Sequence, residues 1–196
     1  MKNNIIIAGV PRAGKSTISH RLSRRFGYQH VSMDSINAGF EKVFPRLGID
    51  TSAKMPPLDI LRNISGKIAP FIRAMLDSGE YDEFTPGMAL DVFQLLPGDY
   101  MKHLHGCNCE IFYFITSDVT PEERFRLLKT HDVEKDHTFH KTDDELWAMC
   151  ENLIIESTYM KEQCIRYNLP YYETARDREE VFKQFFKMLA ETRRQY

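Results

Sequence analysis

Residues 9 to 16 read Gly-Val-Pro-Arg-Ala-Gly-Lys-Ser and match the pattern G-x-x-x-x-G-K-[ST] at every defined position. A short β-branched run from Asn4 to Ala8 precedes this segment, and a helical pattern from Lys15 to Phe26 follows it. The two glycines allow a tight turn in which successive backbone amides and the positive end of the following helix surround an anion. The sequence therefore predicts a strand, a phosphate-binding loop and a helix, rather than a chance glycine-rich turn.

This loop is expected to make several kinds of contact with a bound nucleotide. The expected contact residues are Gly9, Arg12, Ala13, Gly14, Lys15, Ser16 and Thr17. Lys15 is expected to neutralise the β- and γ-phosphates of ATP, Ser16 to bind Mg²⁺, and Thr17 to contact the α-phosphate. For Arg12, a phosphate contact and a solvated side chain fit the sequence equally well.

Strands and helices alternate along the rest of the chain. Strands are predicted at residues 4–8, 28–32, 87–92, 110–115 and 169–173, and helices at 15–26, 34–44, 58–78, from 121, at 143–167 and around 181–189. Two helices begin at capping-box patterns, Thr120-Pro121-Glu122-Glu123 and Thr142-Asp143-Asp144-Glu145. Because helix-length connections join the strands, we expect one α/β domain over residues 1–196, with a five-stranded parallel sheet between two layers of helices.

Two aspartates follow predicted strands at the same edge of this sheet, where ligands of open α/β folds bind. Asp91 follows the third strand and is the expected partner of Ser16 in holding Mg²⁺, although it also fits a cap of the turn toward residues 95–97. Asp34 follows the second strand and fits two roles that do not exclude each other. It can orient or deprotonate an acceptor hydroxyl, or it can cap the helix starting at Ser35.

A basic cluster precedes a polar segment in the second half of the chain. Arg124, Arg126 and Lys129 fit either a clamp on a transferring phosphoryl group or a solvated helix face. The segment 131–141 is too charge-dense to be expected in a core. We therefore expect it to form an exposed loop between two helices.

Composition excludes several classes of protein. A length of 196 residues fits one domain with one core, and a formal net charge of -2 argues against a nucleic-acid partner. No apolar run approaches the ~20 residues needed to cross a membrane. Four cysteines without a paired CxxC framework indicate a reducing, cytoplasmic setting, in which Cys107 and Cys109 are either ordinary thiols or two ligands of a metal site. A monomer and a homodimer are both compatible with the sequence.

The order of these features resembles that of a known family. With the glycine-rich loop at the first strand–helix turn, Asp34 after the second strand, Asp91 after the third and a basic-to-polar segment before a long helix, the chain resembles the P-loop small-molecule and nucleoside monophosphate kinase family. The resemblance spans nearly the whole length. It implies a P-loop NTPase fold of the nucleotide-kinase type with a short lid, and transfer of phosphate from Mg-ATP to a small-molecule or nucleotide acceptor.

The resemblance also implies where each role lies. Lys15 and Ser16 match the nucleotide and magnesium positions, Asp34 the acceptor-side acid, Asp91 the second acid, residues 33–80 the helical acceptor-binding region, and residues 124–142 with Arg124 the arginine-bearing lid. The turn 174–176, with Arg176, is expected to pack against adenine. Closure of such a lid excludes water that would otherwise take the phosphate.

The chain departs from the family where the acceptor would be recognised. After the third strand it has Asp91-Val92-Phe93-Gln94, in place of the Gly-Phe-Pro-Arg-like turn of adenylate kinases or the glycine triplet of shikimate kinases. Neither of those acceptors is supported. Arg46, Arg62 and Arg73 fall in the acceptor region and fit either contacts with an anionic acceptor or side chains displayed to water.

Three functions remain in competition on the sequence alone. A kinase is favoured by the acid after the second strand, the lid-like segment and the small size. A nucleotide-dependent switch or regulatory ATP-binding protein would need a base-specifying motif such as Asn-Lys-x-Asp or a partner-facing loop, and the chain has no such tetrapeptide. A nucleotide-binding protein whose catalysis has decayed is opposed by the intact Lys15 and Ser16.

Overall fold

The computed structural model describes residues 4–51, 54–79, 84–134 and 136–193, and these residues form a five-stranded parallel sheet in the order β2-β3-β1-β4-β5. The strands are β1 (Asn4–Gly9), β2 (Gln29–Ser32), β3 (Met88–Val92), β4 (Cys109–Ile115) and β5 (Tyr171–Glu173). The central strand β1 places Ile7 beside Asp91 of β3 and Phe112 of β4. The parallel sheet and its five strands are confirmed.

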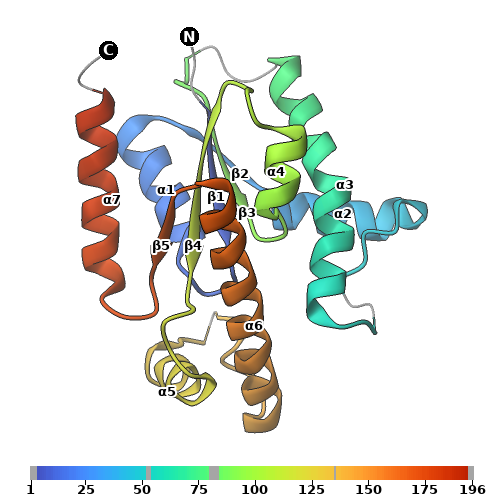
Figure 1. Ribbon diagram of the computed structural model, residues 1–196, viewed down its shortest axis with the longest axis vertical. Helices are drawn as coiled ribbons and strands as arrows, with labels where there is room; N and C mark the ends of the chain where they lie inside the picture. The colour runs from blue at the N-terminus through green and yellow to red at the C-terminus, as the bar shows by residue number, and fades with distance from the viewer. Residues whose placement is uncertain (1–3, 52–53, 80–83, 135, 194–196) are drawn as a thin grey trace.

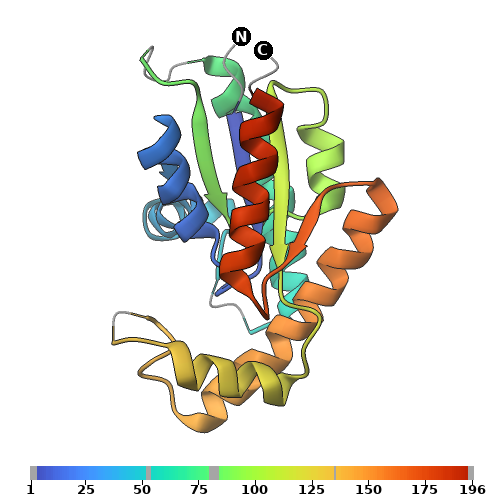
Figure 2. The same cartoon turned by 90° about the vertical axis from the view of Figure 1, so that its left-hand side faces the viewer.

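Helices cover both faces of the sheet. They are α1 (Lys15–Phe26), α2 (Met33–Val43), the 3-10 turn η1 (Pro45–Leu47), α3 (Pro57–Ser78), α4 (Pro97–His103), α5 (Pro121–His131), α6 (Asp143–Tyr167) and α7 (Arg178–Arg193). Helices α1 and α7 lie on one face, and α3, α4 and α6 lie on the other (Figures 1 and 2). Helix α5 and the start of α6 project beyond the carboxyl ends of the strands, where the site lies.

The local sequence signals explain most of these boundaries. Both capping boxes are present, with Thr120 and Glu123 at the start of α5 and Thr142 and Glu145 at the start of α6. The seven-residue helix α4 was not predicted, because so short a segment shows too little of the helical period. Within the described residues, no helix combines the length and the hydropathy that a membrane span requires.

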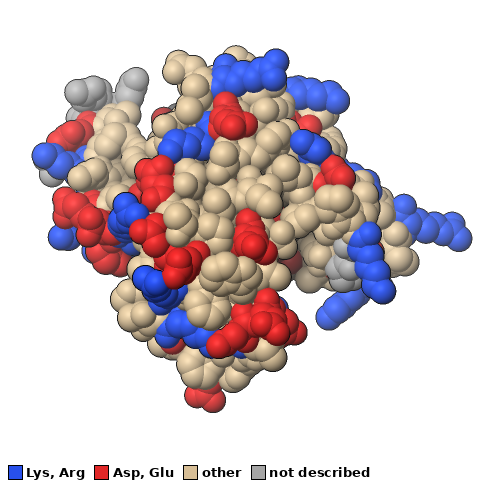
Figure 3. All heavy atoms as spheres, turned by 60° about the horizontal axis from the view of Figure 1, so that its bottom comes forward, with Lys and Arg blue, Asp and Glu red and all other residues tan. Residues whose placement is uncertain are grey.

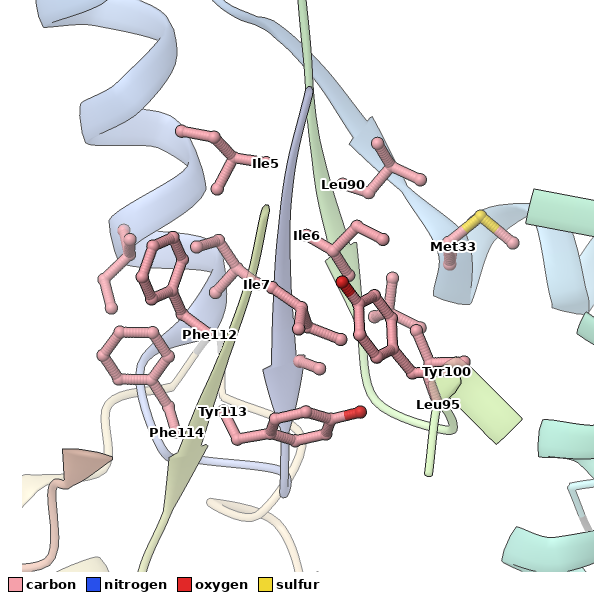
Figure 4. Close-up of a cluster of buried hydrophobic side chains, with 14 of the residues drawn as sticks. Ile5, Ile6, Ile7, Met33, Leu90, Leu95, Tyr100, Phe112, Tyr113 and Phe114 are labelled. Atoms are coloured by element: carbon pink, nitrogen blue, oxygen red, sulfur yellow. The ribbon is translucent and has the colours of Figure 1, made fainter. Parts of the chain in front are cut away.

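The core lies along β1 and β4 because both faces of these strands are covered. Ile5, Ile6 and Ile7 are fully buried. Phe112 and Phe114 meet Phe185 of α7 edge to face, with ring centroids 5.1 and 5.4 Å apart, and Tyr113 between them points to the opposite face (Figure 4). Burial on both faces accounts for the unbroken apolar run in the sequence of β4. The rigid sheet fixes the position of the loop that follows β1.

Candidate active site

The loop between β1 and α1 requires glycine at two positions. Gly9 has a φ of 126° and Gly14 a φ of 92°. A Cβ atom on Gly9 would lie 1.9 Å from the carbonyl oxygen of Phe114, and one on Gly14 would lie 2.4 Å from Cζ of Phe182. The close approach of neighbouring elements therefore leaves no room for a side chain at either position.

A pocket of about 450 Å³ lies against this loop and brings most of the sequence-predicted residues together. Its lining residues are Pro11, Arg12, Gly14, Lys15, Ser16, Thr17, Asp34, Phe93, Asp136, His137 and Arg178. We call it the phosphate pocket. His137 and Arg178 were not predicted as site residues, because neither belongs to a local motif. Arg178 reaches the loop because α7 begins beside Gly14.

Lys15 is buried and interacts electrostatically with three carboxyl groups. Its side chain is 6% exposed, and Nζ donates a hydrogen bond of 3.0 Å to the carbonyl of Val10. Burial lowers the pKa of Lys15, and the negative charges of Asp91, Asp34 and Glu156 oppose this shift. The ammonium group also lies 5.8 Å from the ring centroid of Phe93. Acids from three separate elements thus favour the charged form of the lysine, against the effect of burial.

Asp91 has the properties of a residue that meets a cation. It is 5% exposed, and its Oδ1 has no hydrogen-bond donor among the described residues. Such an orphaned buried carboxylate oxygen is costly unless a cation or water meets it. Ser16, at the start of α1, lines the phosphate pocket, whereas Asp91 does not. A hydroxyl and a carboxylate are oxygen ligands of the kind that Mg²⁺ takes besides phosphate and water.

The described residues contain no group of three or more His, Cys, Asp or Glu side chains arranged for a metal ion. Cys107 and Cys109 are free thiols.

Asp34 does not cap its helix. Helix α2 begins at Met33, and its N-cap is Ser32, whose hydroxyl accepts the hydrogen bond from the amide of Ser35. The capping role considered for Asp34 is therefore wrong, because the helix starts two residues earlier than expected. Asp34 instead lines the phosphate pocket from the first turn of α2. It remains accessible from the pocket mouth, but reduced hydration raises its pKa, against the attraction of Lys15.

Arg12 connects the segment after α5 to the phosphate-binding loop through ion pairs. Its guanidinium forms ion pairs with Asp132 and with Asp136, the latter at 2.7 Å, and Thr138 donates a hydrogen bond to Asp132. Thr138 is 1% exposed. The prediction that residues 131–141 form an exposed loop between two helices is confirmed for most of the described residues of this segment. It is wrong for Asp132 and Thr138, whose side chains are buried because Asp132 pairs with Arg12 and Thr138. Arg12 is neither free nor solvated, although it still lines the phosphate pocket.

Replacing Arg12 tests whether these ion pairs stabilise the segment after α5. We expect Arg12→Ala to leave the buried Asp132 without its counter-ion and to increase hydrogen exchange in residues 132–141 about tenfold, which corresponds to ~1.4 kcal/mol of local stability. Exchange measured by mass spectrometry checks this. Arg126→Ala is the matched control, because Arg126 pairs with Glu122 on an exposed helix face. Equal hydrogen exchange of residues 132–141 in the two variants would contradict a stabilising role of the Arg12 ion pairs.

A second pocket, of about 530 Å³, adjoins the first and carries the basic residues of the lid. Its lining residues are Arg12, Arg124, Leu127, Leu128, His131, Asp132, Thr174, Ala175, Arg176, Asp177, Arg178, Glu179 and Glu180. The turn expected to meet adenine thus lies in the same pocket as Arg124. Arg12 and Arg178 line both pockets, which makes the two continuous.

The basic cluster of α5 divides between this pocket and solvent. Arg124 is 4% exposed, donates a 3.1 Å hydrogen bond to the carbonyl of Arg12, and has its pKa lowered to about 10, mainly by burial. Arg126 and Lys129 are exposed and pair with Glu122 and Asp143. Of the three, only Arg124 is in the lining of this pocket. The acidic and basic groups at this end of the molecule are interspersed over its surface (Figure 3).

A third pocket, of about 250 Å³, is lined mainly by residues of α3 and α6. We call it the side pocket. It shares Pro11 and Phe93 with the phosphate pocket. The three arginines expected near an acceptor do not line it: Arg46, Arg62 and Arg73 are exposed, and Arg62 and Arg73 pair with acids on their own helix.

Glu156 is a buried acid of the side pocket that the sequence analysis missed. It is 7% exposed, and burial raises its pKa to about 7, against the attraction of Lys15. The signal for it is helical spacing, since Glu156 lies three residues after Leu153 and four before Met160 on the buried face of α6.

The raised pKa of Glu156 makes stability depend on pH. The folded protein retains the proton that the unfolded chain loses near pH 4.5, so stability falls as pH rises from about 4.5 to about 7. In Glu156→Gln, we expect the free energy of unfolding not to show this decrease. Relative to that of the wild type, it should rise by about 2–3 kcal/mol across that interval. Urea unfolding at a series of pH values checks this, with Glu151→Gln, on the exposed face of α6, as control. If the free energy of unfolding changes with pH in the same way for the wild type and Glu156→Gln, the prediction is contradicted.

Comparisons with known proteins define the fold. No protein-family model and no curated protein matches the chain. The crystal structure of an unliganded sugar kinase from Janibacter sp. HTCC2649 resembles it with a TM-score of 0.58 and 11% identity, covering 97% of this chain and 95% of that kinase. Shikimate kinase from Bacteroides thetaiotaomicron resembles it with a TM-score of 0.52 and 16% identity, covering 96% and 98%. At these identities the similarity shows that the chain shares their P-loop NTPase fold.

Proposed function

We propose that the protein is an ATP-dependent phosphotransferase that moves the γ-phosphate of Mg-ATP to a small-molecule or nucleotide acceptor. One observation carries the proposal: the phosphate pocket, with Lys15, Ser16 and Asp34, adjoins a separate side pocket through the shared Pro11 and Phe93. A kinase needs such an arrangement, because donor and acceptor must meet with their reacting atoms in contact and water excluded. The kinase folds of the two similar structures support the same function.

Five polar residues of the site have a role in this reaction. The loop amides and Lys15 bind the β- and γ-phosphates, and Arg124 stabilises charge on the transferring group. Ser16 and Asp91 would hold Mg²⁺, which supplies charge neutralisation on the phosphates when bound. Asp34 orients the acceptor hydroxyl and takes its proton. A bond forms from that hydroxyl oxygen to the γ-phosphorus as the bond to the β–γ bridging oxygen breaks, and ADP leaves with the electron pair.

The pocket beside Arg124 would receive the nucleoside. Ala175 and Arg176 line it, and their backbone follows β5 at the edge of the sheet. The segment 124–142 acts as the lid in this proposal: α5 and the residues after it cover the phosphate-binding loop through Arg12, so that opening or closing this segment controls access of water to the phosphates. The reducing cytoplasm is the expected site of action, since the four cysteines are free thiols.

The test is transfer of labelled phosphate from γ-labelled ATP in the presence of Mg²⁺ to a panel of nucleosides, nucleoside monophosphates, sugars and small alcohols. We expect one class of acceptor to be labelled, and Asp34→Asn to lower the rate at least about 100-fold while ATP binding persists. Asp144→Asn, an exposed acid on α6, is the control. Full transfer by Asp34→Asn would remove its catalytic role, and ATP binding without acceptor-stimulated turnover would favour a regulatory ATP-binding protein.

A further inference from the structure

The side pocket is walled mainly by apolar side chains. Ile60, Leu61 and Ile64 of α3 face Met149 and Leu153 of α6 across it. Its volume of about 250 Å³ is below the ~300–1,000 Å³ of pockets that hold drug-sized ligands. The pocket therefore fits a small molecule with an apolar body, of which one end reaches the phosphate-binding loop at Pro11.

No cation lines the side pocket among the residues that the structure describes. The basic residues nearest along α3 have other partners: Arg62 pairs with Asp59, and Lys67 donates a 2.6 Å hydrogen bond to the carbonyl of Gly48. A carboxylate or phosphate that entered these apolar walls would lose hydration without gaining a counter-ion. The charge of Glu156 would add repulsion. The pocket thus disfavours anionic ligands.

Glu156 is the one ionisable group in the described lining of the side pocket, and it lacks a partner there. Its side chain is more than nine-tenths buried, and no described residue donates a hydrogen bond to its carboxyl group. The carboxyl group of Glu156 thus lines the pocket with both oxygens free to accept a hydrogen bond from a ligand, and a carboxylate forms strong hydrogen bonds with such donors. Gln94, close by in the lining, is fixed by a 3.0 Å hydrogen bond from Asn37 to its Oε1. A ligand hydroxyl would satisfy Glu156.

From these observations we infer that the side pocket binds the phosphate acceptor, and that this acceptor is a small uncharged alcohol with an apolar body, of which a hydroxyl donates a hydrogen bond to Glu156. The inference rests on the proposed function, since it takes the phosphate pocket as the donor site. It makes Glu156 a residue that determines specificity. It also separates this chain from kinases whose acceptors carry a carboxylate or phosphate, because those acceptors require a cation in the pocket.

Three probes of one size and shape distinguish the possibilities. They are 1,4-benzenedimethanol, which is neutral, 4-(hydroxymethyl)benzoate, which is anionic, and 4-(aminomethyl)benzyl alcohol, which is cationic. Binding is measured by calorimetry on the full chain at pH 7.5 without nucleotide, so that the result does not depend on catalysis. We expect the neutral diol to bind at least about tenfold more tightly than the anion and more tightly than the cation.

Two variants connect the preference to named residues. Glu156→Gln is expected to weaken binding of the diol about fivefold and to reduce the discrimination against the anion. Asn152→Arg, which adds a cation to the lining, is expected to improve binding of the anion about tenfold. Glu151→Gln, on the exposed face of the same helix, should change neither the affinity for the diol nor the affinity for the anion.

The inference is overturned if the anion or the cation binds the wild type as well as the diol, if none of the three binds, or if Glu156→Gln binds the diol as the wild type does. The proposed function is assessed separately, by ATP binding and by transfer of label to the bound diol. Tight binding of the diol without ATP turnover would count against the phosphotransferase and leave the specificity of the side pocket established.

Discussion

Lys15→Ala is expected to lower phosphate transfer about 1,000-fold and to weaken ATP binding at least about tenfold, because it removes the positive charge that faces the β- and γ-phosphates. The charge is buried and interacts with the negative charges of Asp91, Asp34 and Glu156, so the variant removes the positive charge that these acids face. The negative charges of these acids then repel the phosphates of a nucleotide without the opposing positive charge of Lys15. Equilibrium binding of ATP and single-turnover transfer measure the two effects.

Lys67→Ala is the matched control for this change. Like Lys15, Lys67 donates a hydrogen bond from Nζ to a backbone carbonyl, here that of Gly48, but it lies outside the described lining of the phosphate pocket. It should leave ATP binding and transfer within about twofold of the wild type. Unchanged ATP affinity in Lys15→Ala, with the control also unchanged, would show that the loop is not the nucleotide site.

The sheet could be predicted from the sequence because its signals are local. An unbroken apolar run marks β4, since both faces of that strand are covered, and the two capping boxes mark the starts of α5 and α6. The start of α2 was misplaced because Ser32 and Asp34 both have side chains that can cap a helix. Only the backbone geometry decides between them, and it selects Ser32.

The rest of the site could not be predicted, because distant parts of the chain form it. Arg178 and His137 reach the phosphate pocket from α7 and from the segment between α5 and α6, and no motif links either residue to the loop. The segment 131–141 is mostly exposed, as predicted, but the side chain of Asp132 within it is buried because it pairs with Arg12, 120 residues earlier. Charge density alone does not show whether each charge has a partner.

The glycine at the end of β1 links the fold to the site, and Gly9→Ala is expected to destabilise the protein by at least about 4 kcal/mol or to prevent folding. The new Cβ would lie 1.9 Å from the carbonyl oxygen of Phe114, its neighbour on β4, and the φ of 126° is strained for alanine in any case. Relief requires β1 and β4 to separate at the edge of the sheet that carries the phosphate-binding loop. Urea unfolding measures the loss.

Gly39→Ala provides the comparison, because Gly39 lies within α2 and a Cβ there would meet no atom within 4 Å. Alanine also has a higher helix propensity than glycine, so the free energy of unfolding of this variant should exceed that of the wild type by about 0.5–1 kcal/mol. The opposite signs of the two changes follow from backbone geometry alone. If Gly9→Ala unfolds within about 1 kcal/mol of the wild type, β1 and β4 do not approach as described, and the loop then lacks the support that aims its amides at a phosphate.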